Sequence, residues 1–292
     1  KRMRLAALGT GIVLASTLFL GTVPASATVA PAAVAVSASG FTDLFDGNAL
    51  DPALWATRDR DTSSRRCSTP IAGNTVVSGG ILKSTVKKVT SGAVYNAIIA
   101  KAKAATKKKT AKKACPYGAF TNGMVSTEGT FTMTYGTVNA RIKFPVSQGL
   151  HGSVWLKSAD GTAAEIDLIE SFGYGKGVAS FLYTASGAKN GGYVLKKATK
   201  SKSWWSKWHD YSVTWSPEGG STRFVFKIDG VTTWSVLKAL PVAPYFLVVS
   251  NLSSDWELKY QKKPTKGGAK GVKKAKLPAT MQVASLVVKT AA

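Results

Sequence analysis

The stretch MVSTEGTFTMTYGTVNARIKFP, residues 124–145, decides the fold class of this 292-residue chain. Polar and apolar residues alternate along it, and Gly129 and Gly136 interrupt the alternation. Alternation with a period of two places successive side chains on opposite faces of an extended strand, and glycine is frequent where strands turn. The stretch therefore predicts short β-strands separated by turns.

Runs of the same kind continue to residue 290, rich in Val, Thr and aromatic residues and bounded by Gly, Pro, Ser or Asp. They are GSVWLKS, AEIDLIES, VASFLYTAS, HDYSVTWSP, RFVFKIDG, TTWSVL, YFLVVSNLS and MQVASLVVK. The sequence shows no convincing long amphipathic helix and no internal repeat. A dozen or more short antiparallel strands predict an all-β sandwich or barrel, and one domain is the simplest organisation.

Residues 1–27 have the pattern of a secretory signal peptide. KRMR is basic, LAALGTGIVLASTLFLG is apolar, and the small residues of PASA predict cleavage after Ala27. A transmembrane anchor is the alternative, but the apolar run is short for a span and contains Gly, Thr and Ser. We therefore expect a secreted or cell-wall-associated protein that leaves the membrane on cleavage. Residues 28–40 would be a flexible leader to a folded domain at 41–290.

Two cysteines, Cys67 and Cys115, are present. In an exported chain the default for such a pair is one disulfide bond, and two separate thiols are the alternative. A cysteine-based metal site needs more ligands than this pair offers.

The charge of the chain is strongly basic, with 39 Lys and Arg against 15 Asp and Glu and a formal net charge of +24. Lysines crowd into residues 101–113 and 259–276. Like charges at this density repel one another, so both segments are predicted to be exposed loops. They could hold the protein on a polyanion such as an acidic wall polymer, or they could only keep it soluble. No motif for specific nucleic-acid recognition is present in the sequence.

The stretch AAEIDLIESFG, residues 163–173, holds three of the few acids, Glu165, Asp167 and Glu170. On a regular strand Glu165 and Asp167 share one face, and Glu170 falls on the other. A β-bulge between residues 167 and 170 would return Glu170 to the face of the other two. Without the bulge Glu170 would point at the core, where an unpaired charge is costly. We expect the bulge and three converging carboxylates.

Two converging carboxylates are the groups that cleavage of a glycosidic bond requires. One attacks or stabilises the anomeric carbon and the other protonates the leaving oxygen, and a separation of about 5–5.5 Å predicts retention of configuration. Mutual repulsion should raise the pKa of at least one of the three acids. A solvated outer face with scattered acids is the alternative.

The segment EIDLIESFG resembles the E-x-D-x-x-E signature of glycoside hydrolase family 16, the laminarinase and β-glucanase group. The resemblance extends over most of 41–290 through FTDLFDGNALDPALW, YGTVNARIKFPVSQGLHGSVWLKSADG, WHDYSVTWSPEGGSTRFVFKIDG, PYFLVVSNL and MQVASLVV. It implies a concanavalin A-like β-jelly-roll sandwich of two antiparallel sheets with a concave glycan cleft. It also implies a retaining endo-glycosidase for a β-1,3- or mixed β-1,3/1,4-glucan, in which Glu165 is the nucleophile, Asp167 its helper and Glu170 the general acid/base.

Aromatic side chains stack on sugar faces, so a glycan site should contain them. The candidates for substrate binding are Trp155, Tyr174, Tyr183, Trp204 and Trp205. Trp155 matches a tryptophan of the family near the cleft floor, and Tyr183 stands where the family often has a His. Trp208 and Trp215 are expected to be structural. His151 and His209 lack the partners of a triad or a metal site.

No cofactor is predicted. The family usually has an Asp on the last strand that helps to bind a structural calcium, and Ala284 occupies that place, so calcium is left open. A monomer is the default expectation. The main alternative to an enzyme is a non-catalytic jelly roll that binds a glycan or an acidic wall polymer.

Overall fold

The structure of the chain is a computed structural model. It describes residues 34, 37–58, 65–162, 164–173, 177–183, 206–239, 241–260 and 268–291. The predicted signal peptide, residues 1–27, lies outside the described residues, and so does most of the predicted leader. No helix among the described residues is long and apolar enough to cross a membrane.

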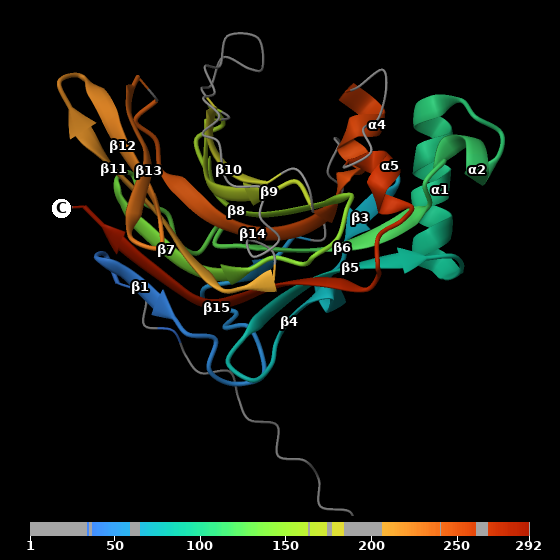
Figure 1. The fold of residues 1–292 in the computed structure, drawn as a ribbon, viewed down its shortest axis with the longest axis horizontal. Coiled ribbons are helices and arrows are strands. Elements are labelled where there is room, and N and C mark those ends of the chain that lie inside the picture. Colours follow the sequence, from blue (N-terminus) through green and yellow to red (C-terminus); the bar gives the residue numbers. More distant parts are fainter. Residues whose placement is uncertain are drawn as a thin grey trace, which may run out of the picture.

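The described residues form two curved layers of β-strands (Figure 1). The first layer contains β10 (Val178–Tyr183), β9 (Glu165–Ser171), β8 (Leu150–Ser158), β14 (Tyr245–Ser253), β6 (Ala119–Ser126) and β2 (Ala56–Thr57). The second contains β4 (Thr75–Val77), β5 (Leu82–Val89), β15 (Ala279–Thr290), β1 (Gly40–Asp43), β7 (Gly136–Lys143), β11 (His209–Glu218), β12 (Ser221–Ile228) and β13 (Val231–Lys238). In Figure 1 β8 and β14 lie above β7 and β15, and β11, β12 and β13 curve upward at the left. Neighbouring strands within both layers are antiparallel, which confirms the predicted sandwich.

One strand belongs to both layers. The first part of β5, Leu82–Val86, pairs with β15 of the second layer, and its last residues, Lys87–Val89, pair with β6 of the first. A further short strand, β3 (Ser68–Pro70), runs parallel to β6. A short 3₁₀ turn, η1 (Ala72–Asn74), leads from β3 into β4. The sandwich is therefore closed along one edge by continuous backbone hydrogen bonding.

The main hydrophobic core lies between the two layers. Leu156 and Val249 of the first layer and Ile142, Trp215 and Phe224 of the second are all buried in it. In β7 the burial alternates along the strand, as the polar–apolar alternation of residues 124–145 predicts. The one polar atom of the Trp215 ring, Nε1, donates a hydrogen bond to the carbonyl of Thr134 at 2.7 Å. Burial of this ring therefore leaves no donor unsatisfied.

The lysine-rich segment 101–113 is not a loop, so that prediction was wrong. Residues 101–106 lie in helix α1 (Gly92–Thr106) and residues 111–113 in helix α2 (Ala111–Ala114), at the right of Figure 1, and residues 107–110 connect the two helices. Six of the fifteen residues of α1 are alanine, the residue with the highest helix propensity. Ile98, Ile99 and Ala102 of α1 pack against the disulfide and Ala114 of α2, and most of the lysines point to solvent. A small apolar face is therefore enough to fold the segment despite its charge.

The second lysine-rich segment, 259–276, is also partly helical. Residues 261–267 lie outside the described part of the chain. Helix α4 (Glu257–Tyr260) follows the 3₁₀ turn η2 (Ser254–Trp256), and helix α5 (Ala269–Val272) comes after the gap. Ala269 and Val272 are buried, and Val272 packs with Phe120 and Leu150. Apolar residues between the lysines therefore anchor this segment, and the prediction of an exposed loop was wrong for residues 269–272.

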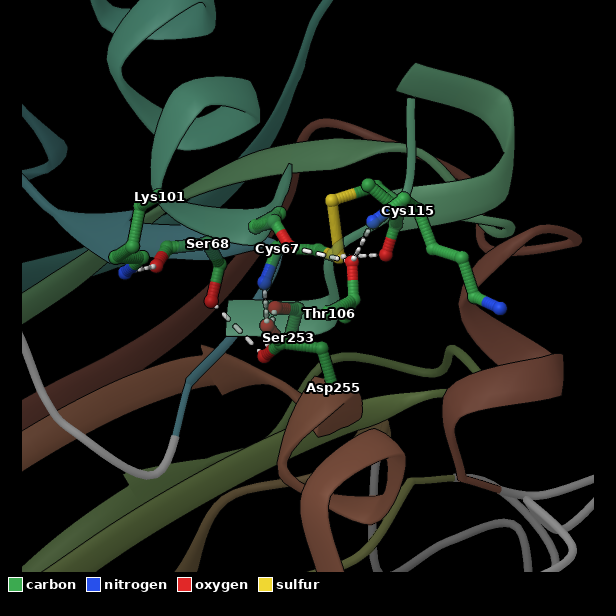
Figure 2. The surroundings of a disulfide bond; sticks show 10 residues. Cys67, Ser68, Lys101, Thr106, Cys115, Ser253 and Asp255 are labelled. Atoms are coloured by element: carbon green, nitrogen blue, oxygen red, sulfur yellow. Dashed lines mark hydrogen bonds between the residues drawn. A yellow bond between two sulfur atoms is a disulfide. The ribbon is translucent and has the colours of Figure 1, made fainter. Parts of the chain in front are cut away.

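The predicted disulfide between Cys67 and Cys115 is confirmed. Figure 2 shows its surroundings, where the buried carboxylate of Asp255 accepts hydrogen bonds from the Cys67 backbone N–H at 2.6 Å and from Ser68 Oγ at 2.9 Å. Lys101 of α1 donates to the Ser68 carbonyl at 3.1 Å. The disulfide and Asp255 together attach β3 and the α1–α2 unit to the end of β14.

Replacement of both cysteines, Cys67→Ser with Cys115→Ser, should lower the free energy of unfolding by about 2–4 kcal/mol. The bond closes a loop with a sequence separation of 48 residues, and its loss gives the unfolded chain more conformational freedom. Urea unfolding monitored by tryptophan fluorescence measures the effect. The wild-type protein under reducing conditions is the control and should match the double variant. A change below about 0.5 kcal/mol would show that the bond contributes little.

Candidate active site

The three acids of the E-x-D-x-x-E segment lie on β9, where the predicted bulge is present. Against β8, Val154 pairs with Ile169 and Trp155 pairs with Asp167, so Leu168 is an extra residue. The same irregularity appears on the other side of β9, between Ala179 and Phe181 of β10. The hydroxyl of Ser180 donates to the Leu168 carbonyl at 2.7 Å and satisfies a backbone group that the bulge leaves without a strand partner.

The bulge separates the acids of β9 from its apolar residues. Ile166, Leu168 and Ile169 all belong to the main core, although residues 168 and 169 are adjacent. In a regular strand adjacent residues point to opposite faces, so the bulge allows both to enter the core. Glu170 is thereby returned to the face that carries Glu165 and Asp167. The structure brings the three predicted acids together on one side of the first layer.

The neighbouring strands add polar and aromatic side chains to this face. Lys157, Trp155 and Ser153 of β8 pair with Glu165, Asp167 and Glu170 respectively. Tyr183, Phe181 and Ala179 of β10 pair with the same three acids from the other side. Because paired residues share a face of the sheet, each acid lies between two side chains from different strands.

Burial makes two of the three acids hard to ionise. Burial and then the charge of Glu170 raise the pKa of Glu165 to about 7, and the Lys157 charge and a hydrogen bond from Asp167 oppose the rise. Complete burial, then the charges of Glu170 and Glu165, raise the pKa of Asp167 well above its usual range. The Oδ2 atom of Asp167 has no hydrogen-bond partner among the described residues. Burial therefore favours the neutral form of Asp167, which donates its proton to Glu165.

Glu170 has a partner that was not predicted from the sequence. Nε2 of His151 lies 2.6 Å from Glu170 Oε1, and Ser153 Oγ donates to the same oxygen at 3.4 Å. On the other side of the ring, Nδ1 of His151 lies 3.1 Å from Nη2 of Arg65. Nothing in the sequence near His151 points to Arg65, which is 86 positions away. His151 is nevertheless in the alternating register of β8, two residues before Ser153, and this spacing is the signal that could have found it.

Two of the five aromatic candidates for substrate binding lie among the described residues. Trp155 lies on the acidic face, packs with Phe246 and Val248 of β14, and donates from Nε1 to Ser250 Oγ at 3.2 Å. Tyr183 is half-buried, with its ring 6.2 Å from that of Phe181. Tyr174, Trp204 and Trp205 lie outside the described residues.

Phe172 was not predicted and extends the aromatic row. Its ring stacks on His151 at 4.8 Å and meets Phe181 edge-on at 5.8 Å. Aromatic rings therefore continue from Tyr183, beside Glu165, to His151, beside Glu170.

The two tryptophans that were expected to be structural lie away from the acids. Trp215 is in the main core, and Trp208 is half-buried beneath the ammonium group of Lys143, 6.0 Å from its ring centroid. His209 pairs through Nδ1 with Asp229 Oδ2 at 2.7 Å on the second layer. Within the described ranges no three His, Cys, Asp or Glu side chains are grouped so that they could hold a metal ion.

Comparison with known proteins places these features in a family. The model of the glycosyl hydrolases of family 16 matches residues 85–254. The chain is 29% identical over 100 residues to the endo-1,3-1,4-beta-glycanase EglC of Rhizobium meliloti (strain 1021). That match covers 34% of this chain and 21% of the relative, so the chain spans about a fifth of the length of that protein.

The fold is similar to those of solved laminarinases. The catalytic domain of an endo-1,3-beta-glucanase (laminarinase) from Thermotoga petrophila RKU-1 superposes with a TM-score of 0.64 and 17% identity, over 86% of this chain and 96% of that one. The endo-beta-1,3-glucanase of Pyrococcus furiosus superposes with a TM-score of 0.63 and 16% identity, over 86% and 94%. The predicted jelly-roll fold is confirmed.

The raised pKa values of Glu165 and Asp167 predict that the protein loses stability as the pH rises. Between the ordinary carboxyl range and about pH 7 the folded state holds protons that the unfolded state has released, so the free energy of unfolding falls with increasing pH. Asp167→Asn removes one of these protons and should raise the melting temperature at pH 8 by about 2 °C or more.

Thermal unfolding of both proteins between pH 4 and pH 9 measures this effect. Asp210→Asn, on the exposed surface of β11, is the matched control and should keep the wild-type dependence. If Asp167→Asn were less stable than wild type at every pH, Asp167 would not be a buried neutral acid.

Proposed function

The chain belongs to the glycosyl hydrolases of family 16, and we propose that it is an exported, retaining endo-glycosidase that hydrolyses a β-1,3- or mixed β-1,3/1,4-glucan. One observation carries the proposal: Glu165, Asp167 and Glu170 converge on one face of the bulged strand β9. Two carboxylates of this kind are the groups that double displacement at an anomeric carbon needs.

Each acid has a distinct task in this reaction. Glu165, when ionised, attacks the anomeric carbon while Glu170 gives a proton to the leaving oxygen. Glu170 then takes a proton from water, and the water displaces Glu165. Because burial raises the pKa of Glu165, attack by the free enzyme should slow as a falling pH protonates this group.

Asp167 supports the nucleophile in both steps. Its proton forms a hydrogen bond to Glu165, which stabilises negative charge on Glu165. This bond favours the ionised nucleophile before attack, and it makes Glu165 a better leaving group when the glycosyl-enzyme is hydrolysed. Burial favours the neutral form of Asp167, and this form is the one that the reaction can use.

The substrate class is proposed from the names of the relatives and from the residues around the acids. EglC is named an endo-1,3-1,4-beta-glycanase, and the Thermotoga protein an endo-1,3-beta-glucanase. Trp155, Tyr183 and Phe181 flank the acids with rings that suit the apolar faces of pyranose sugars. Tyr174, Trp204 and Trp205 remain candidates for further sugar contacts. We propose no catalytic cofactor.

The lysines of the α1–α2 unit are proposed to hold the exported protein on an acidic cell-wall polymer. The chain has no Asp or Glu between Asp61 and Glu128, and none after Glu257. Lys107, Lys108, Lys109, Lys112 and Lys113 are exposed on or between the two helices. Because the stretch of chain that forms the two helices contains no acid, these charges give it a positive potential. A signal peptide and the disulfide are consistent with export.

Glu170→Gln should lower hydrolysis of laminarin or mixed-linkage glucan by about 10²–10⁴-fold, because it removes the general acid/base without changing the shape of the side chain. Release of reducing sugar measures the activity. Glu218→Gln, at the exposed end of β11, is the matched control and should keep full activity.

Xyloglucan, agarose and carrageenan complete the substrate panel. Folded wild-type protein that binds a glycan but releases no sugar from any polymer would contradict the enzyme and favour a glycan-binding protein. Equal activity of wild type and Glu170→Gln would contradict the assignment of Glu170.

The triple variant Lys108→Gln, Lys109→Gln, Lys112→Gln should elute from purified anionic cell wall at lower salt than wild type, since each lost charge weakens a screened attraction. Its hydrolysis of a neutral glucan should be unchanged. The matched control replaces Lys207, Lys227 and Lys289, three exposed lysines outside the α1–α2 unit, with Gln. If both triple variants eluted at the same salt concentration, binding would depend on net charge alone and not on the helices.

A further inference from the structure

His151 lies beside Glu170 in a fixed orientation. It is the second residue of β8, and its ring stacks on Phe172 at 4.8 Å, with an angle of 20° between the planes. The ring of Trp256 lies 6.5 Å away on another side. The side chain of His151 is 15% exposed, so its ring has little freedom to rotate away from Glu170.

Arg65 determines which nitrogen of His151 carries the proton. A guanidinium group is always charged and has only donors, so its Nη2 atom, 3.1 Å from Nδ1, makes Nδ1 the acceptor. In the neutral ring the proton is then on Nε2. Nε2 lies 2.6 Å from Glu170 Oε1 and donates to it.

Arg65 is itself held in place. It is buried, donates from Nη1 to the Ser253 carbonyl at 2.5 Å, and lies 4.0 Å from Asp255 Oδ1. Asp255 also accepts from the Cys67 backbone, two residues after Arg65. The guanidinium position therefore follows from the disulfide segment and from the end of β14, not from the sugar-binding face.

The hydrogen bonds make the two oxygens of Glu170 unequal. Oε1 accepts from His151 and Ser153, and no described residue donates to Oε2. An oxygen that accepts two donors is a poor place for a further proton, so the catalytic proton is carried by Oε2.

We propose that His151, held in its Nε2–H tautomer by Arg65, is a positioning residue that directs the acid proton of Glu170 to Oε2. This proposal rests on the proposed function, since it specifies how the general acid of that reaction is prepared. His151 does not touch the sugar in this mechanism. It acts through Glu170, and the effect is geometric: the proton is placed on the oxygen that no protein donor occupies.

Two variants distinguish the effect of the His151 hydrogen-bond donor from the effect of its aromatic ring. His151→Phe keeps an aromatic ring to stack on Phe172 and removes the donor, whereas His151→Gln keeps an N–H donor near the Nε2 position. His209→Gln is the matched control, because His209 pairs with Asp229 on the second layer. Two rates are measured for each variant. The first is the steady-state hydrolysis of a β-glucan, and the second is the initial burst on a laminari-oligosaccharide that carries a dinitrophenyl leaving group. This leaving group departs without protonation, so its burst does not need the general acid.

His151→Phe should lower kcat on the glucan by up to about 10²-fold with little change in KM. The loss in the burst rate on the dinitrophenyl substrate should be smaller than this loss by a factor of about ten or more. His151→Gln should recover most of the activity, and His209→Gln should match wild type. Equal losses on both substrates, or a His151→Gln variant no better than His151→Phe, would overturn the proposal and leave His151 a packing residue.

A second measurement does not depend on activity. The chain contains two histidines, so ¹⁵N-labelled histidine gives two imidazole signals, and the His209→Gln variant assigns them. At pH 8 the proposal requires a bare Nδ1 and a protonated Nε2 on His151. A protonated Nδ1, alone or together with Nε2, would overturn it even if the enzyme is active. If wild type hydrolyses no glucan but shows the required tautomer, the proposed function fails while the Arg65–His151–Glu170 geometry stands.

Discussion

The candidate site depends on one extra residue in β9. The residue count between Glu165 and Glu170 would place the two on opposite faces of a regular strand, and the bulge at Leu168 cancels this mismatch. The bulge also sends Leu168 and Ile169 together into the core, so apolar burial stabilises the same irregularity that aligns the acids. Fold stability and acid geometry are therefore linked in a single backbone feature, and neither can be changed there without the other.

The surroundings of the three acids divide their roles by electrostatics. Burial is the main cause of the raised pKa values of Glu165 and Asp167. Glu170 instead receives hydrogen bonds from His151 and Ser153. The second layer of the sandwich carries none of these residues. Its part is to cover the apolar side of β9, which allows the first layer to present buried acids on its other face. Such a division is common where a rigid scaffold supports strained or charged groups.

Much of this arrangement follows from local sequence. The alternation in residues 124–145 predicted strands, the spacing of Glu165, Asp167 and Glu170 predicted the bulge, and the cysteine pair predicted the disulfide. The α1–α2 unit was missed because the charge of its lysines was weighed above the helix propensity of its alanines and above its small apolar face. The contacts of His151 were missed for another reason: Arg65 is far from it in sequence, and only the folded chain brings them together.

The strand β5, shared between the two layers, has a consequence for unfolding. Its hydrogen bonds to β15 and to β6 are consecutive along one backbone, so the layers cannot separate without breaking a strand that both use. Independent sheets that only packed face to face could in principle open one at a time. Here the layer with the acids and the layer that covers it are coupled through the main chain, which favours a single cooperative transition. Partial unfolding that exposes the core while the acids keep their arrangement is thereby disfavoured.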